Sequence, residues 1–248
     1  SGLRFSKDDR FDEKRKVFEP SDLERLFNTD IYRANRRPRG GGGEAAFWFP
    51  LITLFSGMRQ SEVAGLRVGD LRPDQTTGIW LSDVRPTEER GVKTASSIRQ
   101  VPVHSELIRI GLLRYRELAV QRGQAAGLGD DAPLWPDLTH TTQRLAAPWS
   151  KWFGRYLREE VGINDPLKVF HSTRHTFKRV ARDADLAEEK HDALTGHAGS
   201  GSVGRGYGRG FGIKALSAGM KKVTVPVDLS WLTWSPGEVP PRKEAKPP

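Results

Sequence analysis

Apolar residues recur at helical spacing over most of this chain, and the pattern predicts a mainly helical protein. In residues 18–27 (FEPSDLERLF), Pro20 and Ser21 precede apolar residues that fall on one face, as at a helix start. Further helices are expected within 44–71, with a break at Ser56 and Gly57, and over 105–123, about 148–161, 172–185 and 187–195. The aromatic stripe of the 148–161 helix is expected to pack in the core.

Short stretches rich in β-branched residues and bounded by Gly and Pro lie within residues 78–104 (GIWLSDV, GVKT and SIRQVPVH). They predict a small antiparallel sheet, so the fold class is mainly α with a small antiparallel β-sheet (α+β). Residues 33–43 (RANRRPRGGGG) read as a loop, because four consecutive glycines are costly inside an element. Its basic residues are expected to be solvated, with weak DNA contact as an addition.

Composition then narrows the class of partner. The 248 residues include 40 Lys and Arg against 31 Asp and Glu, a formal charge of +9 that favours a polyanion such as nucleic acid over a merely solvated basic surface. The absence of cysteine excludes disulfides and thiol nucleophiles. We see no signal peptide and no apolar run near membrane-spanning length, so we expect a soluble, cytoplasmic protein without membrane contact.

The stretch HSTRHTFKR places His171, Arg174 and His175 at i, i+3 and i+4, on one helix face. Zinc is disfavoured there, because Ser172 stands where a glutamate is usual and Arg174 adds a fixed positive charge. A basic helix end and an anion-binding helix start both remain open on these residues alone.

Four further positions could take part in chemistry. Arg59 begins a helix with Glu62 at i+3, a spacing suited to an ion pair. Lys93 is the single lysine among sixteen arginines between residues 17 and 150, and lysine can donate a proton where arginine cannot. His197 precedes a Gly-rich segment that leads to Tyr207. Taken singly, each is as well explained as a surface residue.

Together, in order, the boxes GMRQSE, VKT, HSTRHTF, TGH and GYG resemble the catalytic domain of tyrosine recombinases, the phage-integrase type of site-specific recombinase. The likeness covers about residues 18–212. Thr173 stands where that family commonly has an aliphatic residue, the turn reads Leu-Thr-Gly-His instead of Leu-Gly-His, and the segment before Tyr207 is unusually rich in glycine. None of these departures removes a catalytic group.

The resemblance implies a role for each matching residue. Arg59 and Arg174 would clamp the scissile phosphate, and His171 would accept a proton or bind the phosphate. Lys93 would protonate the leaving 5′ oxygen, His197 would hydrogen-bond the phosphate and Tyr207 would attack it. Glu62 and His175 would support these groups, while Arg179 stays a surface charge. The chemistry implied needs no metal and no cofactor.

The same resemblance implies double-stranded DNA as partner, a homotetramer on DNA and a monomer without it, in a bacterial cytoplasm. Residues 1–17 would be a linker remnant, 18–212 the catalytic domain and 213–248 a C-terminal tail with a disordered end. Within that tail, residues 223–234 would pass to a neighbouring protomer or fold back. Without a separate N-terminal DNA-binding domain, DNA binding should be weak, poorly specific and strongly salt-dependent. Alternatives are a type IB topoisomerase, a non-catalytic DNA-binding regulator and an RNA-binding protein.

Overall fold

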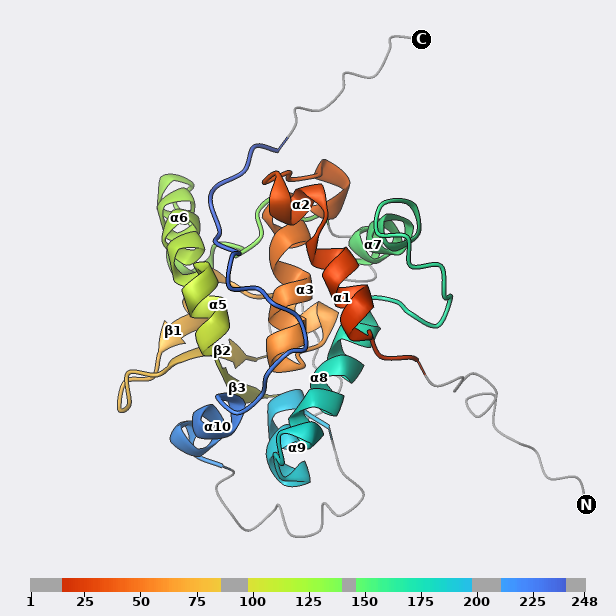
Figure 1. Cartoon of the computed structure of the whole chain (residues 1–248). Coiled ribbons are helices and arrows are strands. Elements are labelled where there is room, and N and C mark those ends of the chain that lie inside the picture. Colours follow the sequence, from red (N-terminus) through yellow and green to blue (C-terminus); the bar gives the residue numbers. More distant parts are fainter. Residues whose placement is uncertain (1–14, 86–97, 140–145, 198–210, 240–248) are drawn as a thin grey trace, which may run out of the picture.

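The computed structural model describes residues 15–85, 98–139, 146–197 and 211–239. It is mainly helical with one small sheet, which confirms the predicted fold class (Figure 1). The helices are α1 (Pro20–Phe27), α2 (Asp30–Arg33), α3 (Glu44–Ser56), α4 (Gln60–Ala64), α5 (Ser105–Ile110), α6 (Leu112–Ala125), α7 (Ala147–Glu159), α8 (His171–Asp183), α9 (Glu188–Thr195) and α10 (Ile213–Met220). No helix in these ranges is both long and apolar enough to cross a bilayer.

Helix α3 is the centre of the core, because its sequence EAAFWFPLITLFS is apolar on every face and all of its residues are buried. It packs against α8, α4 and α5, and Figure 1 shows it running through the middle of the molecule. The aromatic stripe of α7 is buried as predicted, with the rings of Trp149 and Phe153 stacked 5.0 Å apart.

The predicted break after α3 is confirmed at Gly57, which caps the helix with φ +66°. A Cβ at this position would lie 2.4 Å from the ring of Phe177 in α8 and 2.8 Å from Thr195 at the end of α9. Glycine therefore provides both the left-handed conformation and the room for α8 and α9 to approach the end of α3.

Three short strands form an antiparallel sheet in the order β1 (Leu71–Pro73), β2 (Trp80–Val84) and β3 (Arg99–Pro102). The antiparallel pairing of β2 and β3, with Ser82 opposite Val101, confirms the predicted antiparallel sheet, while the predicted GVKT segment lies outside the described residues. Strand β1 was not predicted, because it has only three residues and ends at a proline. Strand β3 contacts α9 and α10, and this places its first residue, Arg99, beside the site described below.

The helices differ from the prediction in two places. The expected helix over residues 105–123 is two helices, because Gly111 takes φ +121° between α5 and α6, and α6 continues past Gly123 to Ala125. Gly123 is needed for packing and does not end the helix, since a Cβ there would lie 2.5 Å from that of Ala132. Helix α10 was not predicted, because its eight residues follow directly on the Gly-rich segment.

The basic loop of residues 33–43 is solvated only in part, so the expectation is wrong for Arg37. The side chain of Arg37 is fully buried and pairs with Glu44 at 2.9 Å, in an interaction that joins the loop to the start of α3. Its second terminal nitrogen donates to the carbonyl oxygen of Ser235 at 3.1 Å. Arg37 therefore holds the backbone at Ser235 against the core, just after the C-terminal segment that was expected to pass to a neighbour or fold back.

That C-terminal segment, residues 223–234, packs against its own chain without pairing to a described strand. Val223, Leu229, Leu232 and Trp234 are buried, and the backbone N–H of Trp234 donates to the carbonyl of Ile110 at 2.7 Å. Its passage to a neighbouring protomer stays a prediction.

Candidate active site

The ends of four helices meet beside the sheet and bring together six of the eight candidate residues. Arg59 and Glu62 come from the start of α4, and His197 follows α9. The first two turns of α8 carry the other three, His171, Arg174 and His175. Two hydrogen bonds join these elements, from Arg59 to Gly196 and from Arg174 to Gly57. Lys93 and Tyr207 lie outside the described residues.

Arg59 is held in place by the residue three positions after it. The carboxylate of Glu62 accepts the backbone N–H of Arg59 at 2.6 Å and one terminal guanidinium nitrogen at 2.9 Å, so the predicted ion pair is confirmed. The other terminal nitrogen donates to the carbonyl of Gly196 at 2.9 Å. With 34% of its side chain exposed, Arg59 is fixed in orientation and still open to a ligand.

Arg99 is a site residue that sequence reasoning missed. Its two terminal nitrogens donate to the two oxygens of Glu62 at 2.9 and 2.8 Å, and its Nε donates to the carbonyl of Leu194 at 2.7 Å. Burial works to raise the pKa of Glu62, but the hydrogen bonds and charges of Arg99 and Arg59 outweigh it and lower that pKa. Glu62 thus stays anionic between two arginines. The available signal was an arginine within the predicted SIRQVPVH strand segment.

Gly196 shapes the turn that carries His197. It caps α9 with φ +64°, and its carbonyl is the acceptor for Arg59. A Cβ at this position would lie 2.7 Å from a terminal nitrogen of Arg99 and 3.3 Å from one of Arg59. The TGH turn therefore requires glycine both for its backbone conformation and for the approach of two arginines.

Arg174 is buried, with 4% of its surface exposed, and it donates to the carbonyl of Gly57. It forms no ion pair with any residue the structure describes. Burial, followed by the charge of nearby Arg59, lowers the pKa of Arg174 to about 10. An arginine held in this way is still protonated at neutral pH, and an anion would relieve its repulsion from Arg59.

His171 and His175 lie one turn apart on α8, with ring centroids 4.9 Å apart and planes at 83°. The pKa of His171 is lowered to about 4, first by partial burial of the imidazole and then by the positive charges of His175, Arg174 and Arg59. His171 is therefore neutral at physiological pH and able to accept a proton.

His197 is exposed at the edge of the same site, and its backbone N–H donates to the carbonyl of Asp192 at 3.1 Å. Its pKa is also lowered, first by the charge of Lys178 and then by partial burial, Arg174 and Arg59. Lys178, on α8, is the second charged neighbour that sequence reasoning passed over. Its signal was its spacing, one turn beyond Arg174.

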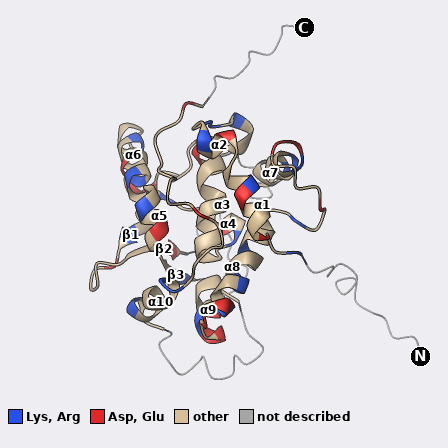
Figure 2. Cartoon of the chain, viewed as in Figure 1, with Lys and Arg blue, Asp and Glu red and all other residues tan. Residues whose placement is uncertain are grey.

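Fixed positive charge exceeds fixed negative charge at this place. Arg59, Arg99, Arg174 and Lys178 stand against the carboxylates of Glu62 and Asp192, four against two. Figure 2 shows basic positions along α8 and acidic positions on α9. The excess positive charge, the guanidinium groups and the start of α8 are together suited to binding an anion. Within the described ranges, no cluster of three or more His, Asp or Glu side chains is arranged to hold a metal ion.

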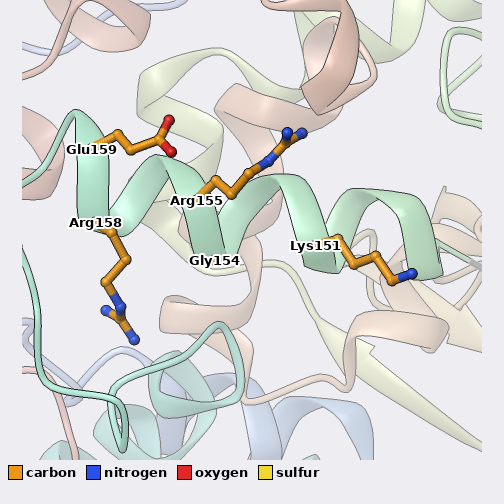
Figure 3. A pocket seen from close by; sticks show the side chains of 5 residues that line it. All are labelled: Lys151, Gly154, Arg155, Arg158 and Glu159. Carbon is orange, nitrogen blue, oxygen red and sulfur yellow. The ribbon is translucent and has the colours of Figure 1, made fainter.

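A second basic surface lies apart from these residues, on the outer face of α7. A groove of about 700 Å³ is lined there by Lys151, Gly154, Arg155, Arg158 and Glu159 (Figure 3). Figure 3 shows the three basic side chains pointing in different directions along the helix, so their charges do not converge on one ligand. Arg158 also donates to the carbonyls of Ile163 and Lys168, which gives it a structural role.

Comparison with known proteins gives similarity to solved structures only. The chain is similar to the Tn1549 transposon integrase in complex with circular intermediate DNA, at 19% identity and a TM-score of 0.49, over 88% of this chain and 69% of that one. It is also similar to the Y379F form of that integrase with transposon right end DNA, at 17% identity and a TM-score of 0.47, over 89% and 70% of the two chains. No protein-family model and no curated protein matches the chain. At these values the likeness assigns no activity to this chain.

Proposed function

We propose that this chain is the catalytic domain of a tyrosine-type site-specific DNA recombinase, which cleaves and rejoins DNA strands through a covalent 3′-phosphotyrosyl intermediate. One observation carries the proposal. Arg59, His171, Arg174 and His197 come from three separate sequence boxes, and they converge on one anion-binding site with unbalanced positive charge. Both the order of the boxes and the convergence of their residues fit phosphodiester chemistry.

In this mechanism the arginines bind the non-bridging oxygens of the scissile phosphate. Arg59 is fixed by Glu62, and Arg174 is fixed by the carbonyl of Gly57, so both are oriented before the substrate arrives. Attack on phosphorus adds negative charge to those oxygens, and preoriented donors stabilise it. Removing one such donor costs on the order of 10²–10³ in rate in comparable sites.

Neutral His171 accepts the proton of the attacking hydroxyl, a role that its lowered pKa favours. His197, exposed next to the arginines, donates a hydrogen bond to the phosphate. Lys93 is the proposed proton donor to the leaving 5′ oxygen, and such acid catalysis contributes roughly 10²–10⁴ in rate. Glu62 and His175 orient the groups that touch the substrate. The chemistry as proposed uses no metal and no cofactor.

The nucleophile in this proposal is Tyr207, and the three other tyrosines of the chain support that choice. Tyr32, Tyr115 and Tyr156 are buried in the core, and burial raises the pKa of each hydroxyl above its ordinary value. Each of those hydroxyls also has a hydrogen-bond partner within the core. None of the three can reach a DNA strand, which leaves Tyr207.

Attack by Tyr207 forms a phosphorus–oxygen bond to the tyrosine and breaks the bond to the 5′ oxygen, which leaves with the donated proton. The phosphodiester energy is kept in the 3′-phosphotyrosyl linkage, so a free 5′ hydroxyl of another strand can reverse the step. We further propose that the chain acts on double-stranded DNA in the cytoplasm, as a tetramer in the synaptic complex.

The test is trapping of the covalent complex. A duplex carrying a recombination site and nicked beside the scissile phosphate loses its short 5′-hydroxyl product, so the adduct accumulates. We expect an SDS-resistant protein–DNA band with the native chain and none with Tyr207→Phe. An equal band with Tyr207→Phe would overturn the assignment, and relaxation of supercoiled DNA without site preference would identify a topoisomerase instead.

A further inference from the structure

Lys178 lies on the same face of α8 as the phosphate-binding residues. His171, Arg174 and Lys178 follow each other at i, i+3 and i+7, so one side of the helix carries a continuous row of nitrogen-bearing side chains. The opposite side of the helix carries Thr176 and Val180, which are both buried. Lys178 cannot turn into that buried side without losing the hydration of its charge, so it extends the row beyond Arg174.

Within the described part of the chain, no carboxylate forms an ion pair with the ammonium group of Lys178. It is half-buried, and it makes no hydrogen bond or ion pair with any of the residues described. Burial and the charges of Arg174, Arg182 and Arg59 act against its positive charge and lower its pKa, whereas the charge of Asp192 acts in its favour. That aspartate lies 3.1 Å from the ring of His191.

A half-buried cation among cations lowers the stability of the free protein. A surface lysine would avoid this cost by turning into solvent, where its charge is fully hydrated. The charge of Lys178 also acts on His197, because it is the largest cause of the lowered pKa of that histidine. The ammonium therefore acts on the group that borders the site, and a bound phosphodiester would supply the counter-charge that Lys178 lacks among the described residues.

We propose that Lys178 is a DNA-binding residue of this site, whose ammonium contacts the phosphodiester held by Arg174 and His197 or the phosphate next to it. This inference deepens the proposed function and rests on it for the identity of the ligand as DNA. Sequence reasoning assigned Lys178 no role. Lys178 adds a third cation to the two arginines that are already proposed to bind the phosphate.

Salt dependence of DNA binding tests the contact without any need for cleavage. Anisotropy of a fluorescein-labelled duplex of arbitrary sequence is measured between about 20 and 200 mM salt, where each lost phosphate contact reduces the slope of log K against log salt by about 0.9. We expect Lys178→Met to reduce the slope by that amount and Lys178→Arg to retain it. Lys222→Met is the matched control, because it removes an exposed charge beyond α10 and should leave the slope unchanged.

Thermal unfolding shows whether the variant folds, and Lys178→Met should unfold at a higher temperature because it removes repulsion from Arg174 and Arg182. A slope and affinity equal to those of the native chain would overturn the proposal. So would an equal loss in Lys222→Met. If the native chain forms no covalent adduct but Lys178→Met still loses one phosphate contact, the proposed function fails and the inference about Lys178 stands.

Discussion

At the scale of single residues, Arg174 and His171 show how neighbouring charges prepare the site. Both have a lowered pKa, and both share the same cationic neighbour, Arg59. The effect on the two is different, because arginine remains charged at pKa about 10 while histidine becomes neutral at pKa about 4. One cluster thus contains a fixed cation and a neutral base, which are the two kinds of group that the proposed chemistry requires.

Arg174→Lys tests the fixed cation. Lysine keeps the charge but cannot donate from several nitrogens in one plane, so contact with both Gly57 and a phosphate would be lost. We expect the rate of adduct formation to fall roughly 10²–10³-fold. Arg179→Lys is the control, since Arg179 pairs with Glu19 at the surface. Equal rates in both variants would contradict the role of Arg174.

The free energy of unfolding should depend on pH, because the pKa values of His171 and of buried His104 are lowered in the folded chain. Each folded-state pKa lies below the unfolded value near 6.5, so the unfolded chain binds more protons at acidic pH. The stabilising contribution is complete above that value and declines as the pH falls from 6.5 toward about 4. Urea unfolding should give a lower free energy of unfolding at pH 5 than at pH 7.5. This difference between the two pH values should be smaller in His171→Asn. An NMR titration of His171 with a pKa at or above 6.5 would contradict this.

At the scale of elements, two glycine caps determine where the helices end and therefore where the site forms. Gly57 ends α3 and Gly196 ends α9, both with positive φ, and the carbonyl of each accepts a hydrogen bond from a site arginine. Helix periodicity predicted most of these helices, because amphipathic spacing and capping residues are local properties. The bend at Gly111 and the strand β1 were not predictable, since tertiary packing decides them.

Gly196→Ala, compared with a matched glycine elsewhere, distinguishes an effect on the geometry of the site from an effect on the stability of the fold. Alanine at φ +64° costs about 1–2 kcal/mol, and its Cβ would also push the guanidinium of Arg99 or Arg59. We expect adduct formation to fall at least about tenfold, since small displacements of positioned groups cost up to ~10² in rate. Gly127→Ala matches the backbone strain at φ +70° with no atoms nearby, and should lose stability only. Equal rates in the two variants would show that crowding at Gly196 is unimportant.

At the scale of the whole molecule, the C-terminal segment closes the core around a buried ion pair. The indole N–H of Trp234 donates to Glu44 at 2.8 Å, and Glu44 pairs with Arg37. Sequence reasoning identified the six site residues that the structure brings together, because their boxes are short and locally distinctive. It missed Arg37, Arg99 and Lys178, whose roles depend on partners far away in the sequence or on packing against other elements.

Trp234→Ala tests this closure. The indole is 4% exposed, and removing it leaves a cavity and a buried carboxylate with one donor fewer. We expect the free energy of unfolding in urea to fall by about 3–5 kcal/mol. Trp231, which is half-exposed and stacked under Arg33, is the control, and its change to alanine should cost less than half as much. A small effect of Trp234→Ala would mean that the segment does not stabilise its own chain.

The central claim is that the site makes a covalent bond between DNA and Tyr207. Mass spectrometry of the trapped complex, after digestion with nuclease and protease, locates the nucleotide on one peptide. We predict that it lies on the fragment that contains Tyr207 and on no fragment with Tyr32, Tyr115 or Tyr156, which are buried. A nucleotide on any other residue, or a trapped complex without one, would contradict the account.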